Sequence, residues 1–403
     1  MSVVICVYTE DRWEDILAAV ASVRAQTLPA LETLLVVDHN PALLDRLAKE
    51  YKEAGEVRVL PNAGLRGLSA GRNTGIAASH GGIIAFLDDD AVAERDWLRR
   101  FADSYRDPRV MAVGGRTVPV WASGRRPGWF PEEFDWVVGC SYRGLPPGRV
   151  RVRNILGGNA SFRREAFDIA GGFATGIGRD GDKRPLGGEE TELCIRLSRA
   201  RPDAVLLVDD RAVIHHKVPE VREHFAYFRT RTYAEGLSKA LVARSVGAAR
   251  GLESERRYTT RVLPAGVARG LRDQLLGRTG GARRAGAIVA GVLTAAGGYA
   301  VGSVRARRNG TTFSVVRTGE VTGRVTGAAA AGGTEATGGP AFAGVGRAAS
   351  DRGDGGATPA AARTDAGPSG ADVPTGAAEP LAPGAAPGDV GAARDVPEAE
   401  GAA

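Results

Sequence analysis

The sequence predicts an α/β protein with a Rossmann-like, mostly parallel sheet flanked by helices. Three observations lead to this prediction. Apolar runs of strand length alternate with segments of helical period through the first 90 residues, and polar side chains stand directly after four of these runs. A late helical stretch and a Gly- and Ala-rich tail then follow. Alternation of this kind is typical of parallel sheets whose strands are joined by helices.

The first half supplies four expected strands, at residues 3–7, 34–37, 57–60 and 83–87. Expected helices lie between them, at residues 14–26, 43–51 and 69–79. In the first of these helices, Ile16, Val20 and Val23 recur on one helical face. The pattern therefore predicts strand–helix–strand units rather than hairpins.

The second half is less regular. Residues 116–148 hold Trp121, Trp129, Trp136 and several prolines, which predicts loops and short strands. The tryptophans could stack on a sugar or lipid acceptor, although aromatic side chains more often fill cores and covering loops. Further elements are expected as strands at residues 156–162 and 204–208, helices at 165–170 and 189–201, and mainly helix from 222 to 308.

Four of the expected strands end in polar residues. These residues are Thr9 and Glu10, Asp38 to Asn40, Pro61 and Asn62, and Asp88 to Asp90. In an open parallel sheet, ligands bind beyond the carboxyl ends of the strands. The polar side chains should therefore gather along one edge of the sheet, which predicts a nucleotide site in the first half.

Three consecutive carboxylates, Asp88, Asp89 and Asp90, follow the apolar run at residues 83–87. They repel one another, and a hard divalent cation such as Mg²⁺ or Mn²⁺ would supply the missing counter-charge. The D-x-D spacing places Asp88 and Asp90 on the same side of an extended chain. A solvated acidic turn is the alternative, but the preceding apolar strand favours a metal site.

A second acidic cluster, Glu189, Glu190 and Glu192, opens an expected helix after two glycines. Acidic residues are favoured at a helix N-terminus by the helix dipole, which is a purely structural explanation. The functional interpretation is a general base, because a positioned carboxylate can remove the proton of an attacking hydroxyl. The leaving group would be a nucleoside diphosphate, whose developing charge a metal would stabilise.

Taken together and in their order along the chain, the motifs of residues 2–235 resemble those of glycosyltransferase family 2, the inverting family with the GT-A fold. The segments that carry the resemblance are 2–9, 36–38, 62–64, 71–75, 87–90, 157–163 and 188–197. The resemblance implies metal-dependent transfer of a sugar from a nucleotide-diphosphate donor to an acceptor hydroxyl of a glycan or a polyprenyl-linked sugar. The nucleotide stays open among UDP, GDP and dTDP.

The resemblance also implies roles for single residues. Glu190 would be the general base, with Glu189 as second choice, because Glu190 stands where the family usually has Asp. Asp90 would bind the metal directly, and Asp88 would touch the metal or the ribose. The other expected substrate-binding residues are Tyr8, Thr9, Glu10, Asp38, Gly64, Arg72, Asn73, Asp89, Gly158 and Asn159. Among these, Asp38 and Arg72 would contact the base and ribose.

A histidine pair and two departures from the family pattern complete the expected site. His215 and His216 follow an apolar stretch, and the resemblance places a histidine near the diphosphate or metal. A neutral imidazole is a reasonable third ligand; of the two we predict His215, with a hydrogen-bonded surface pair as the alternative. Cys6 stands where the family often has Pro, and His39 follows Asp38 where a second acid is common. These departures bear on the nucleotide more than on the reaction.

Other functions fit parts of the sequence. A sugar nucleotidyltransferase would carry a Gly-rich loop with a basic residue after the first strand, where residues 8–11 are Tyr-Thr-Glu-Asp. A non-catalytic sugar-nucleotide-binding protein would have lost the aspartates or the acidic helix start, and both are present. A dinucleotide oxidoreductase is disfavoured because Gly64, Gly67 and Gly71 lack the G-x-G-x-x-G spacing.

The net charge of +6 is unevenly distributed. Residues 244–308 contain thirteen arginines and three acidic residues, and the rest of the chain has 40 basic and 44 acidic residues. This distribution argues against nucleic-acid binding and for a local contact with an anionic membrane surface. Residues 285–304 carry no charge and would be about 30 Å long as a helix. A soluble helical pair, peripheral attachment and a membrane span all remain open for this segment.

Compartment and domain organisation follow from the remaining features. The N-terminus predicts no secretory leader, because a strand is followed at once by charged residues. Cys6, Cys140 and Cys194 lack metal-ligand spacing and are expected to be free thiols in a reducing compartment. We therefore expect a cytoplasmic enzyme, at the inner face of the cell membrane if its basic segment binds there.

The expected parts of the chain are four. Residues 1–115 form the nucleotide-sugar half and residues 116–235 the acceptor half of one GT-A domain, and residues 236–308 form a basic helical extension. Residues 309–403 are rich in Gly, Ala, Pro and Thr and contain no Ile. Such a segment cannot bury enough apolar surface to offset its ordering entropy, so we expect it to be disordered.

Overall fold

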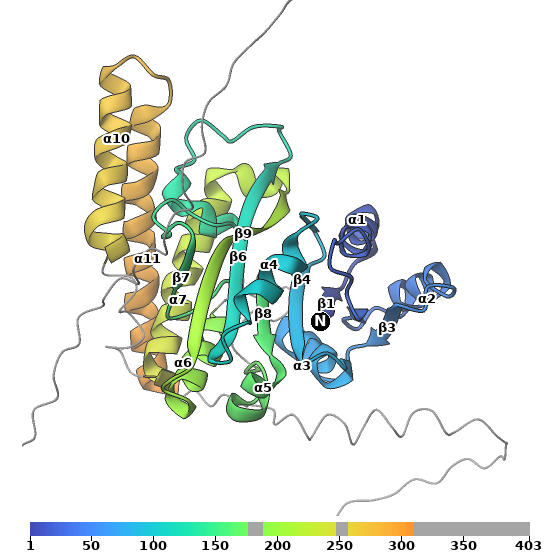
Figure 1. The fold of residues 1–403 in the computed structure, drawn as a ribbon. Coiled ribbons are helices and arrows are strands. Elements are labelled where there is room, and N and C mark those ends of the chain that lie inside the picture. The colour runs from blue at the N-terminus through green and yellow to red at the C-terminus, as the bar shows by residue number, and fades with distance from the viewer. Residues whose placement is uncertain (176–187, 247–256, 310–403) are drawn as a thin grey trace, which may run out of the picture. The chain divides into compact units, whose positions relative to one another are not determined.

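A mixed β-sheet forms the centre of the part of the chain that the computed structural model describes, residues 1–175, 188–246 and 257–309 (Figure 1). Within these residues the nine strands follow the order β3-β2-β1-β4-β8-β6-β9-β5, with β7 paired to β9. The strands are β1 (Ser2–Val7), β2 (Glu32–Val37), β3 (Val57–Pro61), β4 (Ile83–Asp88), β5 (Ala91–Ala93), β6 (Val110–Trp121), β7 (Arg149–Arg151), β8 (Asn159–Arg163) and β9 (Val205–Val218).

The α/β prediction is confirmed, and the sheet divides into two parts by strand direction. Strands β1, β2, β3 and β4 pair in parallel, as the strand–helix alternation predicts. Strand β8 then pairs antiparallel to both β4 and β6, and β9 pairs parallel to β6 but antiparallel to β5 and β7. Hydrophobic periodicity carries no information on strand direction, so the antiparallel half was not predicted.

Two layers of helices cover the sheet. The helices of the body are α1 (Trp13–Arg24), α2 (Pro41–Glu50), α3 (Leu68–Ala78), α4 (Trp97–Ser104), α5 (Arg164–Ala170) and α6 (Glu189–Ala200). Helices α1, α2 and α4 contribute to one buried cluster, and α3, α5 and α6 to another. Along β1, Val3 and Ile5 belong to the first cluster and Val4 to the second, as the alternation of strand side chains requires.

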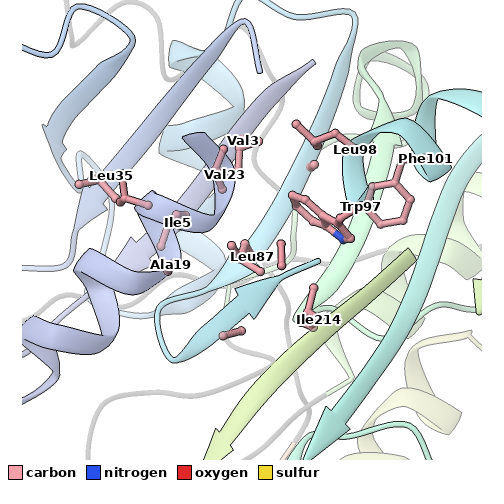
Figure 2. Close-up of a cluster of buried hydrophobic side chains, with 14 of the residues drawn as sticks. Val3, Ile5, Ala19, Val23, Leu35, Leu87, Trp97, Leu98, Phe101 and Ile214 are labelled. Atoms are coloured by element: carbon pink, nitrogen blue, oxygen red, sulfur yellow. The ribbon is translucent and has the colours of Figure 1, made fainter. Parts of the chain in front are cut away.

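Trp97 lies in the middle of the first cluster (Figure 2). Its ring packs 5.2 Å from that of Phe101, and its indole N–H donates to Oδ1 of Asn159 over 2.8 Å. Because Asn159 is the first residue of β8, this hydrogen bond ties helix α4 to that strand. A buried Trp whose N–H is satisfied adds apolar area without a desolvation penalty.

Local capping explains where two early elements begin. Asn40 accepts a hydrogen bond from the Leu43 N–H over 3.0 Å, and Pro41 occupies the first turn of α2, where its missing N–H has no cost. Thr9 caps the short 3₁₀ turn Glu10–Arg12 in the same way. These caps end β1 and β2 and direct the chain away from the sheet edge.

The helical extension packs on the sheet through a third buried cluster. Its elements are α7 (Phe225–Val246), the π-helical turn Tyr258–Val262, α10 (Leu263–Leu275) and α11 (Gly281–Asn309). The cluster combines Trp121, Phe130 and Phe134 with residues of the extension such as Phe228 and Ile288. The three tryptophans of residues 116–148 pack in or against this cluster, so the core interpretation of these residues holds.

Three further expectations can be compared with the structure. Residues 116–121 continue β6, and Glu132–Val138 forms a 3₁₀ helix, so the expected irregular segment is more ordered than predicted. The three cysteines are free thiols, as predicted. The predicted disordered tail lies outside the described residues, apart from Asn309.

Candidate active site

The carboxyl ends of the parallel strands bring the first polar residues together. Strand β1 pairs with β2 and β4, so Val7 lies beside Val37 and Cys6 lies beside Asp88. The residues that follow each strand therefore share one edge of the sheet, as the sequence predicted. This edge carries the aspartate cluster.

The three aspartates differ in exposure. The Asp88 side chain, at the last position of β4, is 37% exposed, whereas Asp89 and Asp90 are buried. Nη1 of Arg12 lies 2.5 Å from Oδ1 of Asp89 and 3.0 Å from Oδ2 of Asp90. Arg12 therefore supplies part of the counter-charge that the sequence analysis assigned wholly to a metal. The sequence gives no local signal for this contact, because Arg12 is a single basic residue after two acids.

The protonation behaviour of the cluster follows from burial. The pKa of Asp89 is raised to about 7. Burial is the main cause, the charge of Arg12 opposes it, and the negative charge of the neighbouring Asp90 adds to it. Burial also raises the pKa of Asp90, but His216 and the charges of Arg12 and Arg222 outweigh it and hold this pKa below its usual value. Asp90 is thus the carboxylate that stays ionised in the interior.

His216, and not His215, faces the aspartates. Nδ1 of His216 lies 3.0 Å from Oδ1 of Asp90, and the imidazole is buried. His215 is 41% exposed and contacts Glu94 with its Nε2 at 3.1 Å. Adjacent residues of a strand point to opposite faces of the sheet, so only one of the pair can reach the cluster. The prediction of His215 as the ligand is therefore corrected to His216.

The donor atoms of this cluster fit a hard divalent cation. Ligand atoms of Asp88, Asp90 and His216 all lie within 4.8 Å of one another. Oδ1 of the buried Asp90 and Nδ1 of His216 lie 3.0 Å apart, so a carboxylate oxygen and an imidazole nitrogen stand together where a cation could contact both. Carboxylate oxygens with one imidazole nitrogen suit Mn²⁺, and the oxygens suit Mg²⁺.

A second buried arginine lies behind His216. Nη1 of Arg222 is 3.3 Å from Nε2 of His216, and the guanidinium stands over the ring of Tyr227 at 5.9 Å. Arginine has no acceptor atom, so Nε2 of His216 accepts in this contact. Arg222 thereby fixes the orientation of the imidazole. Arg222 lies six positions after His216 and belongs to no sequence motif, so it was not predicted as a site residue.

Arg72 joins the acidic helix start to the aspartates. Its Nη1 lies 2.9 Å from Glu190 and 3.3 Å from Glu189, and its Nη2 lies 3.9 Å from Asp88. The guanidinium is buried and also stands over the ring of Phe173 at 5.2 Å. Arg72 is thus engaged by the acids of both clusters, and its contact with the base and ribose stays a prediction.

The two glutamates of α6 differ in access. The side chain of Glu190 is 15% exposed and that of Glu189 is 6% exposed. Burial raises the pKa of Glu189 to about 8, and repulsion by Glu190 adds to it while Arg72 opposes it. Oε2 of Glu189 has no hydrogen-bond partner among the described residues. Glu190 is the more accessible member of the pair.

Gly157 and Gly158 separate the two acidic groups. A Cβ at Gly157 would overlap Oε1 of Glu190, and a Cβ at Gly158 would overlap Oδ2 of Asp88. The backbone before β8 therefore lies directly against the base candidate and the first aspartate, where any side chain would displace a carboxylate. The need for two glycines here is steric, since neither has a positive φ.

The remaining expected residues fall into two groups. Tyr8 is exposed beside Arg12, and Asp38 accepts from Nδ2 of Asn62 (2.7 Å) and from the N–H of Gly67 (2.9 Å). Thr9 hydrogen-bonds to Asp11, and the carbonyl of Gly64 lies 2.9 Å from Nε2 of His39. These residues lie on the loops that follow β1, β2 and β3, so they remain candidates for the nucleotide pocket, as does Glu10.

The side-chain amides of Asn73 and Asn159 form hydrogen bonds within the protein interior. The Asn73 amide exchanges two hydrogen bonds with the backbone of Phe173, at 2.9 and 2.8 Å. The fully buried amide of Asn159 accepts from Trp97 and donates to the carbonyls of Arg116 and Ala212. Both amides are fully engaged in holding loops together, so the prediction that they bind substrate directly is not supported by their contacts.

Comparison with known proteins adds three findings. The profile of the family described as Glycosyl transferase family 2 matches residues 2–169. A glucosyl-dolichyl phosphate glucuronosyltransferase of Haloferax volcanii is 38% identical over 243 residues, which are 60% of this chain and 77% of that protein. The glycosyltransferase AglE of the same organism is 32% identical over 185 residues, which are 45% of this chain and 58% of that protein.

A solved structure also aligns with the chain. It is the mannosyltransferase PcManGT from Pyrobaculum calidifontis in complex with GDP-Man and Mn²⁺, at 18% identity and a TM-score of 0.45. The alignment covers 73% of this chain and 86% of that one.

Proposed function

Since the chain belongs to glycosyltransferase family 2, we propose that it transfers a sugar, with inversion, from a nucleoside-diphosphate donor to the hydroxyl of a lipid-linked acceptor. One observation carries this proposal. Glu190 and Asp88 lie against the neighbouring backbone positions Gly157 and Gly158, and both contact Arg72. A donor whose diphosphate meets the aspartates would have its anomeric carbon directed towards Glu190.

Glu190 is proposed as the general base. The acceptor oxygen attacks the anomeric carbon, the bond from that carbon to the diphosphate oxygen breaks, and the acceptor proton passes to the carboxylate of Glu190. Arg72 positions this carboxylate at 2.9 Å. Glu189 is more buried and holds its proton to higher pH, so it suits a supporting role between Arg72 and the interior.

Asp88, Asp90 and His216 would hold a divalent cation, Mg²⁺ or Mn²⁺. When bound, the cation neutralises charge on the departing diphosphate. Arg12 keeps Asp89 and Asp90 paired, and Arg222 orients His216, so the ligands are held in place by the protein itself. This arrangement lowers the reorganisation needed when the donor binds.

The acceptor and the location are proposed from similarity. The Haloferax relative is named for a glucosyl-dolichyl phosphate, which is a sugar on a polyprenyl lipid. We therefore favour a lipid-linked acceptor over a soluble glycan, and the cytoplasmic face of a membrane as the place of reaction. The donor half would be residues 1–115 and the acceptor half residues 116–235, and UDP, GDP and dTDP remain candidates for the nucleotide.

Donor binding followed by calorimetry tests the proposal. UDP-, GDP- and dTDP-sugars are titrated into the wild type with Mn²⁺, with Mg²⁺ and with EDTA, and the donor that binds is then incubated with a polyprenyl-phosphate sugar. We expect binding of one donor that depends on the cation and is lost in Asp90→Ala, and a product of inverted configuration. The matched control is Asp103→Ala, a surface aspartate outside the site, which should bind as the wild type does.

Two results would contradict the proposal. The first is cation-independent donor binding that Asp90→Ala leaves unchanged. The second is tight donor binding by a folded protein that transfers no sugar to any lipid-linked acceptor, which is the behaviour of a non-catalytic sugar-nucleotide-binding protein.

A further inference from the structure

Helices α10 and α11 form a hairpin (Figure 1). Apolar side chains are exposed together on this hairpin. The large hydrophobic residues exposed on it are Leu271, Leu275, Leu276, Val289, Val292, Leu293 and Val304. Leu275 is 88% exposed and lies at the end of α10, where the chain turns towards α11. Exposed leucines in this density on a soluble surface mark an interaction site.

Seven of the exposed residues of α11 form one continuous stripe. They recur every three or four positions, so they share a helical face: Ala282, Gly286, Val289, Leu293, Ala296, Ala300 and Val304. No member of this stripe is charged. A second, shorter stripe on α10 has the same spacing and consists of Pro264, Ala268, Leu271 and Leu275. We call these two faces the hairpin stripes.

The opposite face of α11 is packed against protein. A Cβ at Gly291 would come within 3.0 Å of Phe228 and closer still to Phe134, and a Cβ at Gly298 would overlap the backbone of α7 at Tyr233. Thr294 and Thr232 exchange a hydrogen bond of 2.6 Å. The hairpin therefore has one side fixed to the catalytic body and one side free.

Within the described residues, Gly281–Val304 is long and apolar enough to cross a membrane by length and composition. Its neighbour argues against a span. Helix α7 packs along α11 and carries Arg231, Glu235 and Lys239, with Arg231 and Glu235 paired at 3.1 Å. A charged helix bound along α11 would have to enter the hydrocarbon with it, which is costly. The geometry suits a helix that lies on the surface of a bilayer.

The charges around the stripes select the kind of surface. Residues 257–304 contain seven arginines and one acid, Asp273. Asp273 is already paired with Arg278 (3.1 Å) and Arg284 (2.8 Å). The exposed Arg272 and Arg283 thus have no acidic partner within the hairpin. Cations flanking an apolar face complement anionic lipid headgroups, whereas a second copy of the hairpin would bring like charges together.

We infer that the α10–α11 hairpin docks the protein on an anionic lipid bilayer, with the hairpin stripes inserted among the lipids and the arginines at the headgroups. This surface lies outside the transferase site and does not depend on the identity of the acceptor. It would hold the catalytic edge of the sheet near the membrane in which a lipid-linked acceptor resides.

Vesicle co-sedimentation of the full chain tests the inference, with no sugar donor present. Vesicles of phosphatidylcholine alone are compared with vesicles of phosphatidylcholine and phosphatidylglycerol in equal parts. We expect strong binding to the anionic vesicles, weak binding to the neutral ones, and release at high salt. Each arginine near an anionic surface contributes about fivefold, so Arg272→Glu with Arg283→Glu should weaken binding at least about 25-fold. The charge control is Arg106→Glu, on an exposed arginine of the body.

Leu293→Glu tests the apolar contribution, and burial of one leucine predicts a loss of at least about tenfold. Leu293 is 67% exposed, so the change should leave folding intact, and circular dichroism checks this. The matched control is Leu31→Glu, at an apolar residue that is 59% exposed and lies outside the hairpin. If Leu293→Glu does not fold, Leu275→Glu replaces it.

Four outcomes would overturn the inference. They are no binding of the wild type to anionic vesicles, equal binding of Leu293→Glu and the wild type, and resistance of the membrane-bound protein to alkaline carbonate, which would indicate a span. The fourth is a wild-type dimer that Leu293→Glu converts to a monomer without any vesicle binding, which would assign the stripes to a second copy of the chain.

Discussion

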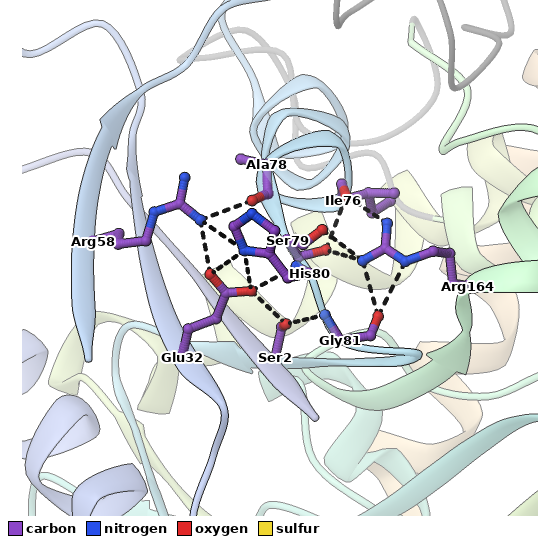
Figure 3. A network of polar contacts seen from close by, with 9 residues as sticks. All are labelled: Ser2, Glu32, Arg58, Ile76, Ala78, Ser79, His80, Gly81 and Arg164. Carbon is purple, nitrogen blue, oxygen red and sulfur yellow. Dashed lines mark hydrogen bonds and ion pairs between the residues drawn. The ribbon is translucent and has the colours of Figure 1, made fainter. Parts of the chain in front are cut away.

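Buried carboxylates at the two ends of the parallel strands differ in how completely their oxygens are hydrogen-bonded. At the amino end of β2, Glu32 accepts hydrogen bonds from Ser2 (2.7 Å), Arg58 (2.7 Å) and the N–H of His80 (2.6 Å), and both of its oxygens are engaged (Figure 3). At the carboxyl end, Oδ2 of Asp89 has no hydrogen-bond partner among the described residues. The same is true of Oε2 of Glu189.

The pKa values follow this difference. Burial raises the pKa of Glu32, but hydrogen bonds from His80, Ser2 and Arg58 outweigh it and lower the pKa to about 2. Burial raises the pKa of Asp89 to about 7 and that of Glu189 to about 8, because their partners do not satisfy them fully. The fold completes its hydrogen bonds at one end of the strands and leaves them incomplete at the other, where a ligand can complete them.

The largest expected effect is the loss of catalysis in Glu190→Gln, near the carboxyl ends of the parallel strands. Glu190→Gln removes the proposed base and should lower the transfer rate about 10³-fold. Donor affinity should change little, because the aspartates and Arg12 remain. The free energy of unfolding should also stay near the wild-type value, because Arg72 keeps Glu189 and Asp88 as partners. Transfer kinetics and thermal unfolding of the same preparation measure both; a rate within tenfold of the wild type would remove Glu190 from the role of base.

A smaller catalytic effect is expected from Gly157→Ala. The new Cβ would overlap Oε1 of Glu190 and push the carboxylate away from its position on Arg72. A displacement of about 1 Å at a reacting group costs about 10²-fold in rate. The control is Gly82→Ala, since a Cβ there meets nothing within 4 Å. Equal rates for the two alanine variants would mean that Glu190 is not held by this contact.

At the amino ends of the strands, Glu32→Gln should lower the free energy of unfolding and leave catalysis unchanged. Loss of charge-assisted hydrogen bonds to Glu32 is expected to lower the free energy of unfolding by about 2 kcal/mol at pH 7. The pKa of Glu32 is lower in the folded state, about 2, than its ordinary value of 4.5. Its contribution is therefore complete above about pH 4.5 and is lost as the pH falls towards 2. Urea unfolding at pH 7 and pH 3.5 measures the difference, which should shrink at the lower pH.

The smallest effect is expected from Glu189→Gln. The pKa of Glu189 is higher in the folded state, about 8, than its ordinary value of 4.5, so the wild type should lose stability as the pH rises between these values. The glutamine variant lacks this loss, so it should be more stable than the wild type at pH 8, and the difference should narrow towards pH 5. Unfolding curves from pH 5 to pH 8 follow this difference. If the variant is less stable than the wild type at pH 8, the Glu189 carboxylate is stabilised by its hydrogen bonds, as that of Glu32 is.

The sequence by itself determined the features that depend on neighbouring residues. Apolar runs and helical periods identified the parallel half of the GT-A fold. The position of Asp88 to Asp90 after a buried strand located the acidic edge, and the glycines before Glu189 and Glu190 located the start of α6. These signals are local, because strand ends and helix starts are set by residues a few positions apart.

The tertiary structure decided which distant groups meet. The choice of His216 over His215 depends on which face of β9 points to Asp90, and that is set by the pairing of β9 with β6 and β5. Arg12 contacts Asp89 from 77 positions before it, and Arg222 contacts His216 from six positions after it, and neither arginine lies in a sequence motif. Sequence periodicity fixes the face on which a residue lies, but contacts between elements depend on strand order and register, which only the folded chain defines.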